Sequence, residues 1–422
     1  EAGRTTAADG TVRRAPPAGE PQRLAAFVAA ALLMLLSFAA FEEVGQEATW
    51  AAAIGALAGF SLYHAAFGFT GGWRRFVRER RGAGIRAQCL LVGLTAAVAM
   101  PLIAYGDRLG LPTVGYVFPL GVATATGAFL FGIGMQLGGG CGSGTLFTLG
   151  GGSTRMVVVL AAFVAGSFLA TLGFGFWMAL PALPPASIAD GALGPAGAVA
   201  VTLLVLAGIA LATVRIERAR HGSIDHGPAT GRLVSGPWSL ALGAAALALV
   251  GVLTLLALGR PWGITSAFAL WGAKIAHGLG FPVADVPYWS GAMAAVERSV
   301  LADHTSVMNF GIMIGALLAA AAAGRFAPRL ALDRRDVATA IAGGLLMGYG
   351  ARLAFGCNIG GLLGGIASGS LHGWGWLAFG FLGSAVGVAL RARLGMDPPI
   401  ARSGPPAPPE DVTARPTKGT RA

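Results

Sequence analysis

The sequence predicts an all-α polytopic membrane protein with about 10–13 transmembrane or re-entrant helices. Hydrophobic residues make up 55% of the chain and charged residues only 12%, whereas soluble domains carry about 25% charged residues. The mean hydropathy is +0.68, and apolar runs long enough to span a bilayer recur along the chain. Glycine occurs 67 times, which suits helices that pack closely in a membrane or break beside a cavity.

One transmembrane domain, residues 24–393, is expected between two disordered tails, the basic cytoplasmic segment 1–23 and the segment 394–422. An uncleaved first helix is favoured over a signal peptide, because a long tail precedes the first apolar run and no clear cleavage site follows it. The stretch 262–300 could span, re-enter or lie at the interface, since its apolar part is short and prolines follow it. The other spans are expected at about 24–41, 49–70, 87–106, 116–137, 155–180, 195–214, 236–258, 306–323, 337–354 and 373–392.

The net charge of +11 is carried mainly by loops rather than by one binding face, which argues against a nucleic-acid partner. Arginines gather in the N-terminal tail and near residues 73–86, 215–232 and 325–335, whereas the loop from Glu42 to Glu47 is acidic. This alternation places the basic loops and the N-terminus in the cytoplasm. The expected location is the bacterial inner membrane.

Two of the three cysteines lie in an internal repeat. The segment Gly132–Leu146 reads GIGMQLGGGCGSGTL and contains Cys141, and the segment Gly348–Leu362 reads GYGARLAFGCNIGGL and contains Cys357. Aligned without gaps, the segments are identical at 7 of 15 positions, the cysteines included. Three cysteines are too few for a disulfide framework and show no metal-ligand spacing. We therefore expect no metal and no cofactor.

The expected topology runs the helix into Cys141 inward and the helix into Cys357 outward, so the repeat is inverted. Inverted repeats place a substrate site near the membrane midplane, between broken helices. The glycine-rich segments around both cysteines disfavour a continuous helix. Half-helices that restart at about Thr145 and Leu362 would present free N–H groups to an anion. Repeat one covers about 49–180 and repeat two about 306–392.

A cysteine thiol is soft, polarizable and a weak hydrogen-bond donor, so it suits a ligand that exposes sulfur. The competing interpretation is a small buried residue at a tight packing point, which we favour for Cys89. Arg352 and Gln136 each lie five residues before a repeat cysteine, and intramembrane Arg352 and Lys274 are functional candidates, although either could instead serve a helix end or the interface. The predicted substrate pathway comprises Cys141, Cys357, Gly140, Gly142, Gly144, Gly356, Asn358, Gly360, Arg352, Gln136 and Lys274.

The two cysteine hairpins and the run from Pro261, PWGITSAFALWGAK, resemble the YeeE/YedE family of sulfur transporters over about residues 51–393. The resemblance implies uptake of thiosulfate, which is handed between cysteine thiols along an hourglass pore, here Cys141 and Cys357. Related versions of the family are tied to sulfur oxidation and to selenium. Many members carry a further cysteine in a pattern like GRFCFTSAFRD, where this chain has Gly68.

The function predicted from the sequence is a channel-like membrane transporter for thiosulfate or a related small sulfur-containing anion, not an enzyme. A membrane sulfurtransferase that carries a cysteine persulfide is an alternative, but no soluble catalytic domain or nearby general base favours it. A transporter of a selenium species and a subunit that anchors partners are further alternatives. The expected partners are the anion and the lipid bilayer, with a cytoplasmic sulfur-carrier protein as a further candidate.

Overall fold

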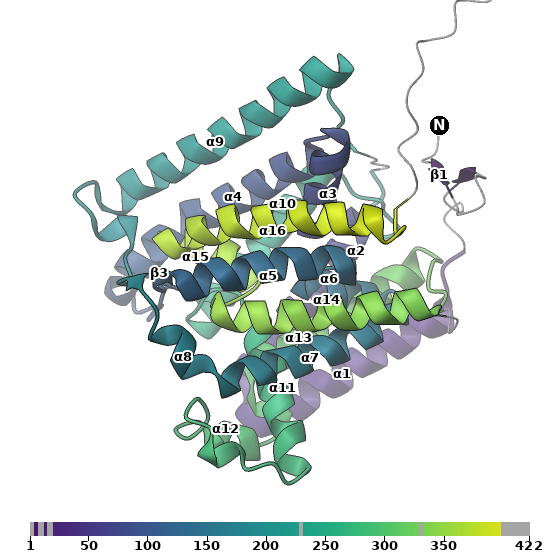
Figure 1. Cartoon of the computed structure of the whole chain (residues 1–422). Helices are drawn as coiled ribbons and strands as arrows, with labels where there is room; N and C mark the ends of the chain where they lie inside the picture. The colour runs from purple at the N-terminus through teal and green to yellow at the C-terminus, as the bar shows by residue number, and fades with distance from the viewer. Residues whose placement is uncertain (1–3, 7–11, 15–19, 228–230, 329–331, 398–422) are drawn as a thin grey trace, which may run out of the picture.

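The computed structural model describes the chain except residues 1–3, 7–11, 15–19, 228–230, 329–331 and 398–422. Within the described residues, ten segments are long and apolar enough to cross a membrane, and each overlaps an expected span. The predicted fold class, an all-α polytopic membrane protein, is therefore confirmed. The main helices are α1 (Arg23–Val44), α2 (Gln46–Ala65), α4 (Ala83–Tyr105), α5 (Val122–Gly138), α7 (Arg155–Leu172), α9 (Gly194–His221), α10 (Leu240–Leu258), α13 (His304–Ala322), α14 (Arg334–Leu353) and α16 (Leu371–Arg393) (Figure 1).

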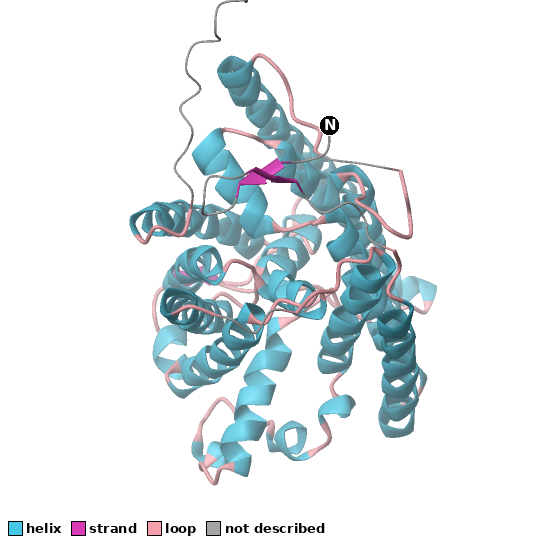
Figure 2. Ribbon diagram, turned by 90° about the vertical axis from the view of Figure 1, so that its right-hand side faces the viewer, coloured by secondary structure: helices cyan, strands magenta, loops and turns pink. Residues whose placement is uncertain are grey.

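Short elements join these helices, and strands are a minor part of the described structure (Figure 2). One small strand pair falls within segment 1–23, where the sequence predicts disorder; much of the rest of that tail, and residues 398–422 of the other tail, lie outside the described residues. The strands pair antiparallel as β1 (Arg4–Thr6) with β2 (Val12–Arg14) and β3 (Leu120–Gly121) with β4 (Ala182–Leu183). The short helices are α3 (Phe69–Glu79), α6 (Gly142–Gly150), α8 (Phe174–Met178), α11 (Thr265–Gly278), α12 (Met293–Glu297), α15 (Gly365–Ala367), the 3-10 turns η1 (Gly106–Leu109), η2 (Ile188–Asp190), η3 (Val283–Asp285) and η4 (Val300–Ala302), and the π-helix η5 (Asn358–Gly364).

The ambiguous stretch 262–300 contains one helix of 14 residues, α11. Such a helix rises about 21 Å, which is less than the roughly 30 Å of a bilayer core. Near its end, Lys274 donates from Nζ to the carbonyl of Val296 at 2.8 Å and also to that of Arg298. These bonds tie α11 to the loop that carries α12. By its length α11 is a short helix rather than a spanning one.

Helices α5 and α14, which lead into the two repeat cysteines, lie side by side and antiparallel (Figure 1). Gly127 near the start of α5 contacts Gly350 near the end of α14, and Gly138 at the end of α5 contacts Gly343. A Cβ on Gly343 would lie 2.2 Å from the backbone nitrogen of Gly138. Glycine is therefore required for this close approach, as in other membrane helix pairs.

The neighbouring helices obey the same symmetry, because α5 packs on α16 as α14 packs on α7. A Cβ on Gly132 would lie 2.6 Å from the nitrogen of Ser384, and one on the equivalent Gly348 would lie 2.5 Å from the nitrogen of Ser167. Because α5 and α14 are antiparallel, these equivalent contacts relate the two halves by a pseudo-twofold axis, as expected for an inverted repeat. The structure thus brings the two helix breaks together at the centre of this arrangement.

Candidate functional site

Each repeat cysteine lies at the start of a second helix, after a sharp reversal of the chain. The residue two positions earlier has a left-handed backbone in both copies, with φ +86° at Gly139 and φ +55° at Phe355. Cys141 and Cys357 then have almost identical extended conformations, with ψ −166° and −165°. The shared backbone shows that the sequence repeat is also a repeat of conformation.

The second helices begin directly after the cysteines, earlier than the expected restarts at about Thr145 and Leu362. The carbonyl of Cys141 accepts the N–H of Thr145 at 2.8 Å, and the carbonyl of Cys357 accepts that of Gly361 at 2.8 Å. Glycine is a poor helix former in isolation, but here tight packing requires small residues. Each cysteine is consequently the N-cap residue of its helix, where unpaired N–H groups favour an anion.

The backbone carbonyls at the ends of α5 and α14, the helices that lead into the cysteines, are also bound by side chains in an equivalent way. Arg155, at the start of α7, donates to the carbonyls of Leu137 and Gly138. In the other copy, His372, at the start of α16, donates from Nε2 to the carbonyl of Ala354 at 3.2 Å. The sequence analysis did not single out this role, because neither residue lies within the gapless repeat.

The two thiols are buried, and both hairpins come together around α6. Cys141 is 1% exposed and Cys357 is 0% exposed. A Cβ on Gly142 would lie 3.1 Å from Sγ of Cys357, and a Cβ on Gly144 would lie 3.5 Å from Sγ of Cys141. The hydroxyl of Ser143 lies 3.5 Å from Sγ of Cys141. The two hairpins therefore meet where Sγ of Cys357 packs against Gly142, the residue that directly follows Cys141.

A cavity of about 240 Å³ lies beside Cys141. One of its walls comes from the loop between α2 and α3 and from α3 itself, and another from the hairpin between α5 and α6. Arginines stand at this cavity, so it combines a thiol with positive charge. Its lining includes Gly68, Thr70, Arg74, Arg75, Gln88, Gly139, Gly140, Cys141, Gly144 and Phe147.

The other predicted residues are distributed around this centre. Gln136 lies behind one wall, where its Nε2 donates to the carbonyl of Thr70 at 3.1 Å and to Oγ of Ser384 at 2.7 Å. Arg352 lies near the C-terminal end of α14, and its guanidinium is 5.7 Å from the ring centre of Tyr288. Like Lys274, which binds loop carbonyls, Arg352 is not part of the cavity lining.

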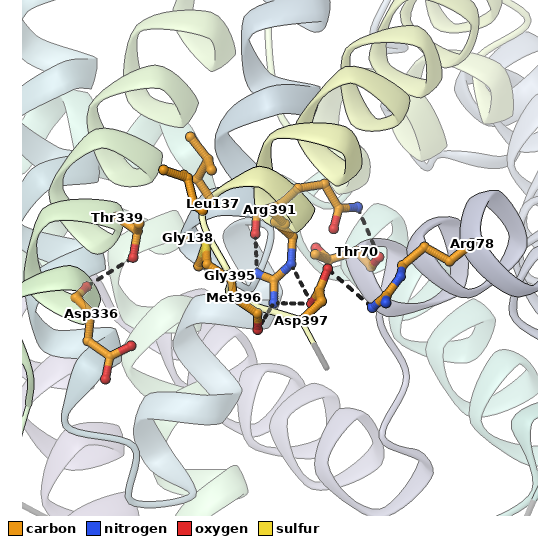
Figure 3. A network of polar contacts seen from close by, with 12 residues as sticks. Thr70, Arg78, Leu137, Gly138, Asp336, Thr339, Arg391, Gly395, Met396 and Asp397 are labelled. Carbon is orange, nitrogen blue, oxygen red and sulfur yellow. Dashed lines mark hydrogen bonds and ion pairs between the residues drawn. The ribbon is translucent and has the colours of Figure 1, made fainter. Parts of the chain in front are cut away.

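A network of charged residues stands at the end of α5, close to the cavity (Figure 3). The guanidinium of Arg391 donates to the carbonyl of Gln136 at 2.7 Å and to the carboxylate of Asp397 at 2.7 Å, and Arg78 pairs with the same carboxylate at 3.2 Å. Burial raises the pKa of Asp397, but hydrogen bonds from Arg391 and the charges of Arg391, Arg78 and Arg74 together bring it below the usual range. We call the surface around Arg74, Arg78, Arg155 and Arg391 the arginine-rich face.

Comparison with known proteins matches the sulphur-transport family to residues 64–386 of this chain. The probable transporter YedE of Salmonella typhimurium is 32% identical over 140 residues, which is 33% of this chain and 33% of that relative. The thiosulfate transporter TsuA of Spirochaeta thermophila is 30% identical over 297 residues, 67% of this chain and 82% of the relative. TsuA of Escherichia coli is 26% identical over 351 residues, 78% of this chain and 90% of the relative. The match to YedE spans only about a third of that relative's length.

The fold and the site together define a multi-pass membrane protein in which two broken helices of an inverted repeat meet at a pair of buried thiols. The match over residues 64–386 shows that the chain belongs to the sulphur-transport family, and the resemblance to the YeeE/YedE transporters is confirmed. Its relatives are transporters, which agrees with the prediction that the protein is not an enzyme.

Proposed function

We propose that this protein carries thiosulfate, or a closely related sulfur-containing anion, across the membrane by passing it between the thiols of Cys141 and Cys357. The observation that carries the proposal is that two buried cysteines stand at equivalent helix starts and that Sγ of Cys357 packs against Gly142, the residue directly after Cys141. The relatives named as thiosulfate transporters support the choice of substrate.

The proposed step is an exchange of weak hydrogen bonds and forms no covalent bond. The thiol of Cys141 donates to the terminal sulfur of the anion, and the thiol of Cys357 then replaces it as donor. A thiol is a weak donor, and a pore needs binding that is weak enough to release the ion. The N–H groups at the starts of α6 and η5 offset the negative charge during the exchange.

Beyond Cys357, Asn358 and Gly360 extend the proposed pathway. Asn358 is fully buried, and neither Nδ2 nor Oδ1 of its side chain has a hydrogen-bond partner in the described structure. A buried amide without partners costs free energy, which a passing anion and its water would offset. At Gly360 a Cβ would meet nothing closer than 3.8 Å, at Gly263 and then at Trp262 and Tyr116.

The two charged candidates, Arg352 and Lys274, have different partners and therefore different proposed roles. Nε of Arg352 is buried and has no partner among the described residues, so Arg352 is suited to drawing in the anion at the end of α14. Lys274 is bound to the carbonyls of a neighbouring loop, which favours a structural role. We place the arginine-rich face in the cytoplasm of a bacterial inner membrane, with the N-terminus on that side. A cytoplasmic sulfur-carrier protein would meet the transporter there.

The proposal is tested with the purified full chain in liposomes and radiolabelled thiosulfate. Wild-type vesicles should accumulate label. Cys141→Ala and Cys357→Ala should each lower the initial rate by at least about tenfold, because the free energy of one lost hydrogen bond to a charged group corresponds to a factor of that size. Cys89→Ala, at a half-buried position in α4, is the matched control and should transport at the wild-type rate.

Serine replacements separate a soft donor from a packing residue. Cys141→Ser and Cys357→Ser should be slow, because a hydroxyl binds water and hard oxygens more strongly than a thiol does. Wild-type rates in both serine variants would refute the thiol exchange. Loss of alkylatable thiol during turnover, with label left on the protein, would instead favour the persulfide enzyme.

A further inference from the structure

The cavity beside Cys141 is lined by an arginine that forms no ion pair with any described residue. Arg74 of α3 lines the cavity and is half-buried, and its guanidinium makes no hydrogen bond or ion pair within the described parts of the chain. Its neighbour Arg75 also lines the cavity but pairs with Asp225 at 2.7 Å and with Glu79 at 3.6 Å. A half-buried charge without a partner is costly, so Arg74 is suited to a ligand of opposite charge.

The two carboxylates whose charges act on Arg74, those of Asp397 and Glu79, already pair with other arginines. Asp397 accepts from Arg391 and pairs with Arg78, and Glu79 pairs with Arg75. Both acids are therefore paired with other arginines, and among the described residues the charge of Arg74 remains in excess at the cavity. An anion that entered the cavity would supply the missing charge.

Thr70, one turn before Arg74, offers an independent sign of a ligand. Its side chain is 4% exposed and lines the same cavity, yet its Oγ1 has no hydrogen-bond partner in the described structure. Thr70 is the second residue of α3, so the helix offers no carbonyl four residues earlier to accept from its hydroxyl. The buried hydroxyl is thus a donor available to something in the cavity.

There is also space for a small ion between these donors and the thiol. A Cβ added to Gly68 or to Gly71 would meet no atom within 4 Å. On this side of the cavity the lining residues Thr70 and Arg74 offer oxygen and nitrogen donors, and the thiol of Cys141 belongs to the opposite hairpin wall. The wall formed by α3 is therefore chemically different from the wall formed by Cys141.

We propose that Arg74 and Thr70 form an oxyanion subsite that holds the oxygen end of the transported anion and turns its terminal sulfur toward Cys141. This inference rests on the proposed function and specifies how the substrate is oriented at the same site. Guanidinium and hydroxyl groups are strong donors to charged oxygens, whereas the thiol matches the softer sulfur atom. Arg74 and Thr70 are positioning residues that set affinity, and the thiol exchange sets the rate.

The subsite is tested by protection of Cys141 from a small alkylating reagent in the purified full-length protein, with the modified peptide quantified by mass spectrometry. Thiosulfate should slow the reaction, and sulfate, which has oxygens but no terminal sulfur, should slow it at higher concentration. Arg74→Gln should raise the half-protecting concentration of both anions by about tenfold and Thr70→Val by about threefold. Arg74→Lys keeps the charge and should restore most of the protection.

Arg220→Gln is the matched control, because Arg220 is exposed at the end of α9, carries the same charge and does not line the cavity. It should leave protection unchanged. Equal half-protecting concentrations in wild type and Arg74→Gln would overturn the subsite, as would protection that falls equally in Arg74→Gln and Arg220→Gln. The second result would mean that only the overall charge of the face matters.

Transport in liposomes separates this inference from the proposed function. Arg74→Gln should raise the thiosulfate concentration for half-maximal uptake and leave the maximal rate nearly unchanged. If wild-type vesicles transport thiosulfate and Arg74→Gln vesicles have the same concentration dependence, the subsite is wrong while the proposed function stands. If wild-type vesicles transport none, the proposed function fails, and only the protection data then decide the subsite.

Discussion

In the hairpin at Cys141 the thiol borders a cavity lined by arginines, whereas in the hairpin at Cys357 packed aromatic side chains surround the same turn. Nε1 of Trp376 donates to the carbonyl of Gly356 at 3.1 Å, and the ring of Phe355 stacks on that of Phe118 with 4.8 Å between centroids. The backbones match at the cysteines and then differ, because Cys141 begins an α-helix and Cys357 a π-helix, so the two hairpins differ in side chains and in their second helices. An inverted repeat can thus supply two equivalent thiols and still give each side of the membrane its own surface.

The difference extends to how each hairpin is held in place. Arg155 and Arg391 bind the carbonyls at the end of α5, whereas the rings of His372 and Trp376 bind those after α14. Charged residues suit a face that meets water, and rings suit an apolar surrounding. The Cys141 half is consequently the part of the site that solution conditions should affect most.

The largest expected effect is a difference in thiol reactivity between the two hairpins. In a Cys89→Ala background, a small maleimide should modify Cys141 about a hundredfold faster than Cys357, because Cys141 borders the cavity of about 240 Å³ and Cys357 is not among the residues that line it, and the reaction at a closed site waits for a local opening. Time-resolved mass spectrometry of the two peptides measures both rates. Comparable rates would show that the aromatic packing around Cys357 is as open as the cavity.

A second prediction concerns Gly142, which follows Cys141 and packs against the thiol of Cys357. A methyl group on Gly142 would lie 3.1 Å from Sγ of Cys357 and 3.5 Å from Ile264, whereas one on Gly144 would make only an ordinary contact of 3.5 Å with Sγ of Cys141. Gly142→Ala should therefore displace the second thiol and lower uptake about tenfold, with Gly144→Ala losing at most about half.

Both alanines are placed in α6, where alanine favours the helix by about 1 kcal/mol over glycine. Poor folding is therefore not the expected cause of a difference, and the yield of monodisperse protein checks this. Equal uptake by Gly142→Ala and Gly144→Ala would mean that the close approach of the two hairpins is not part of the transport route.

Much of the fold could be predicted because membrane helices leave a strong signal in composition. Ten spans followed from apolar runs, and the hairpin repeat followed from two matched cysteines. The symmetry of α7 and α16 was missed, although Gly166-Ser167 in α7 repeats as Gly383-Ser384 in α16. One extra residue between hairpin and helix shifts this part of the repeat, so an alignment without gaps ends before it.

The side chains around the cavity were harder to predict than the thiols. Arg74 belongs to a basic segment that the positive-inside pattern already explains, so its lack of an acid partner appears only when Asp397 and Glu79 are seen with other arginines. Thr70 gives no signal in sequence, because an unpaired hydroxyl is a property of packing. Lys274 and Arg352 were singled out as rare intramembrane charges, and the structure places both away from the cavity.

The smallest expected effect tests the ionic support of the Cys141 half. Asp397, whose side chain is 6% exposed, accepts hydrogen bonds from Arg391 at 2.7 and 3.0 Å, and Arg391 in turn holds the end of α5. Asp397→Asn should lower the stability of the detergent-purified protein by about 1–2 kcal/mol at pH 7. Because the folded protein depresses the pKa of this carboxyl, the stabilisation that the carboxylate provides is complete above the unfolded pKa of about 4 and is lost as the pH falls through the folded pKa.

The gap in unfolding temperature between wild type and Asp397→Asn should therefore close in acid. A gap that is the same at pH 7 and at about pH 3 would mean that the carboxylate's charge does not stabilise the hairpin. The Cys357 half, held by rings, provides the comparison: Trp376→Phe should cost a similar amount at every pH, because no titrating group is lost.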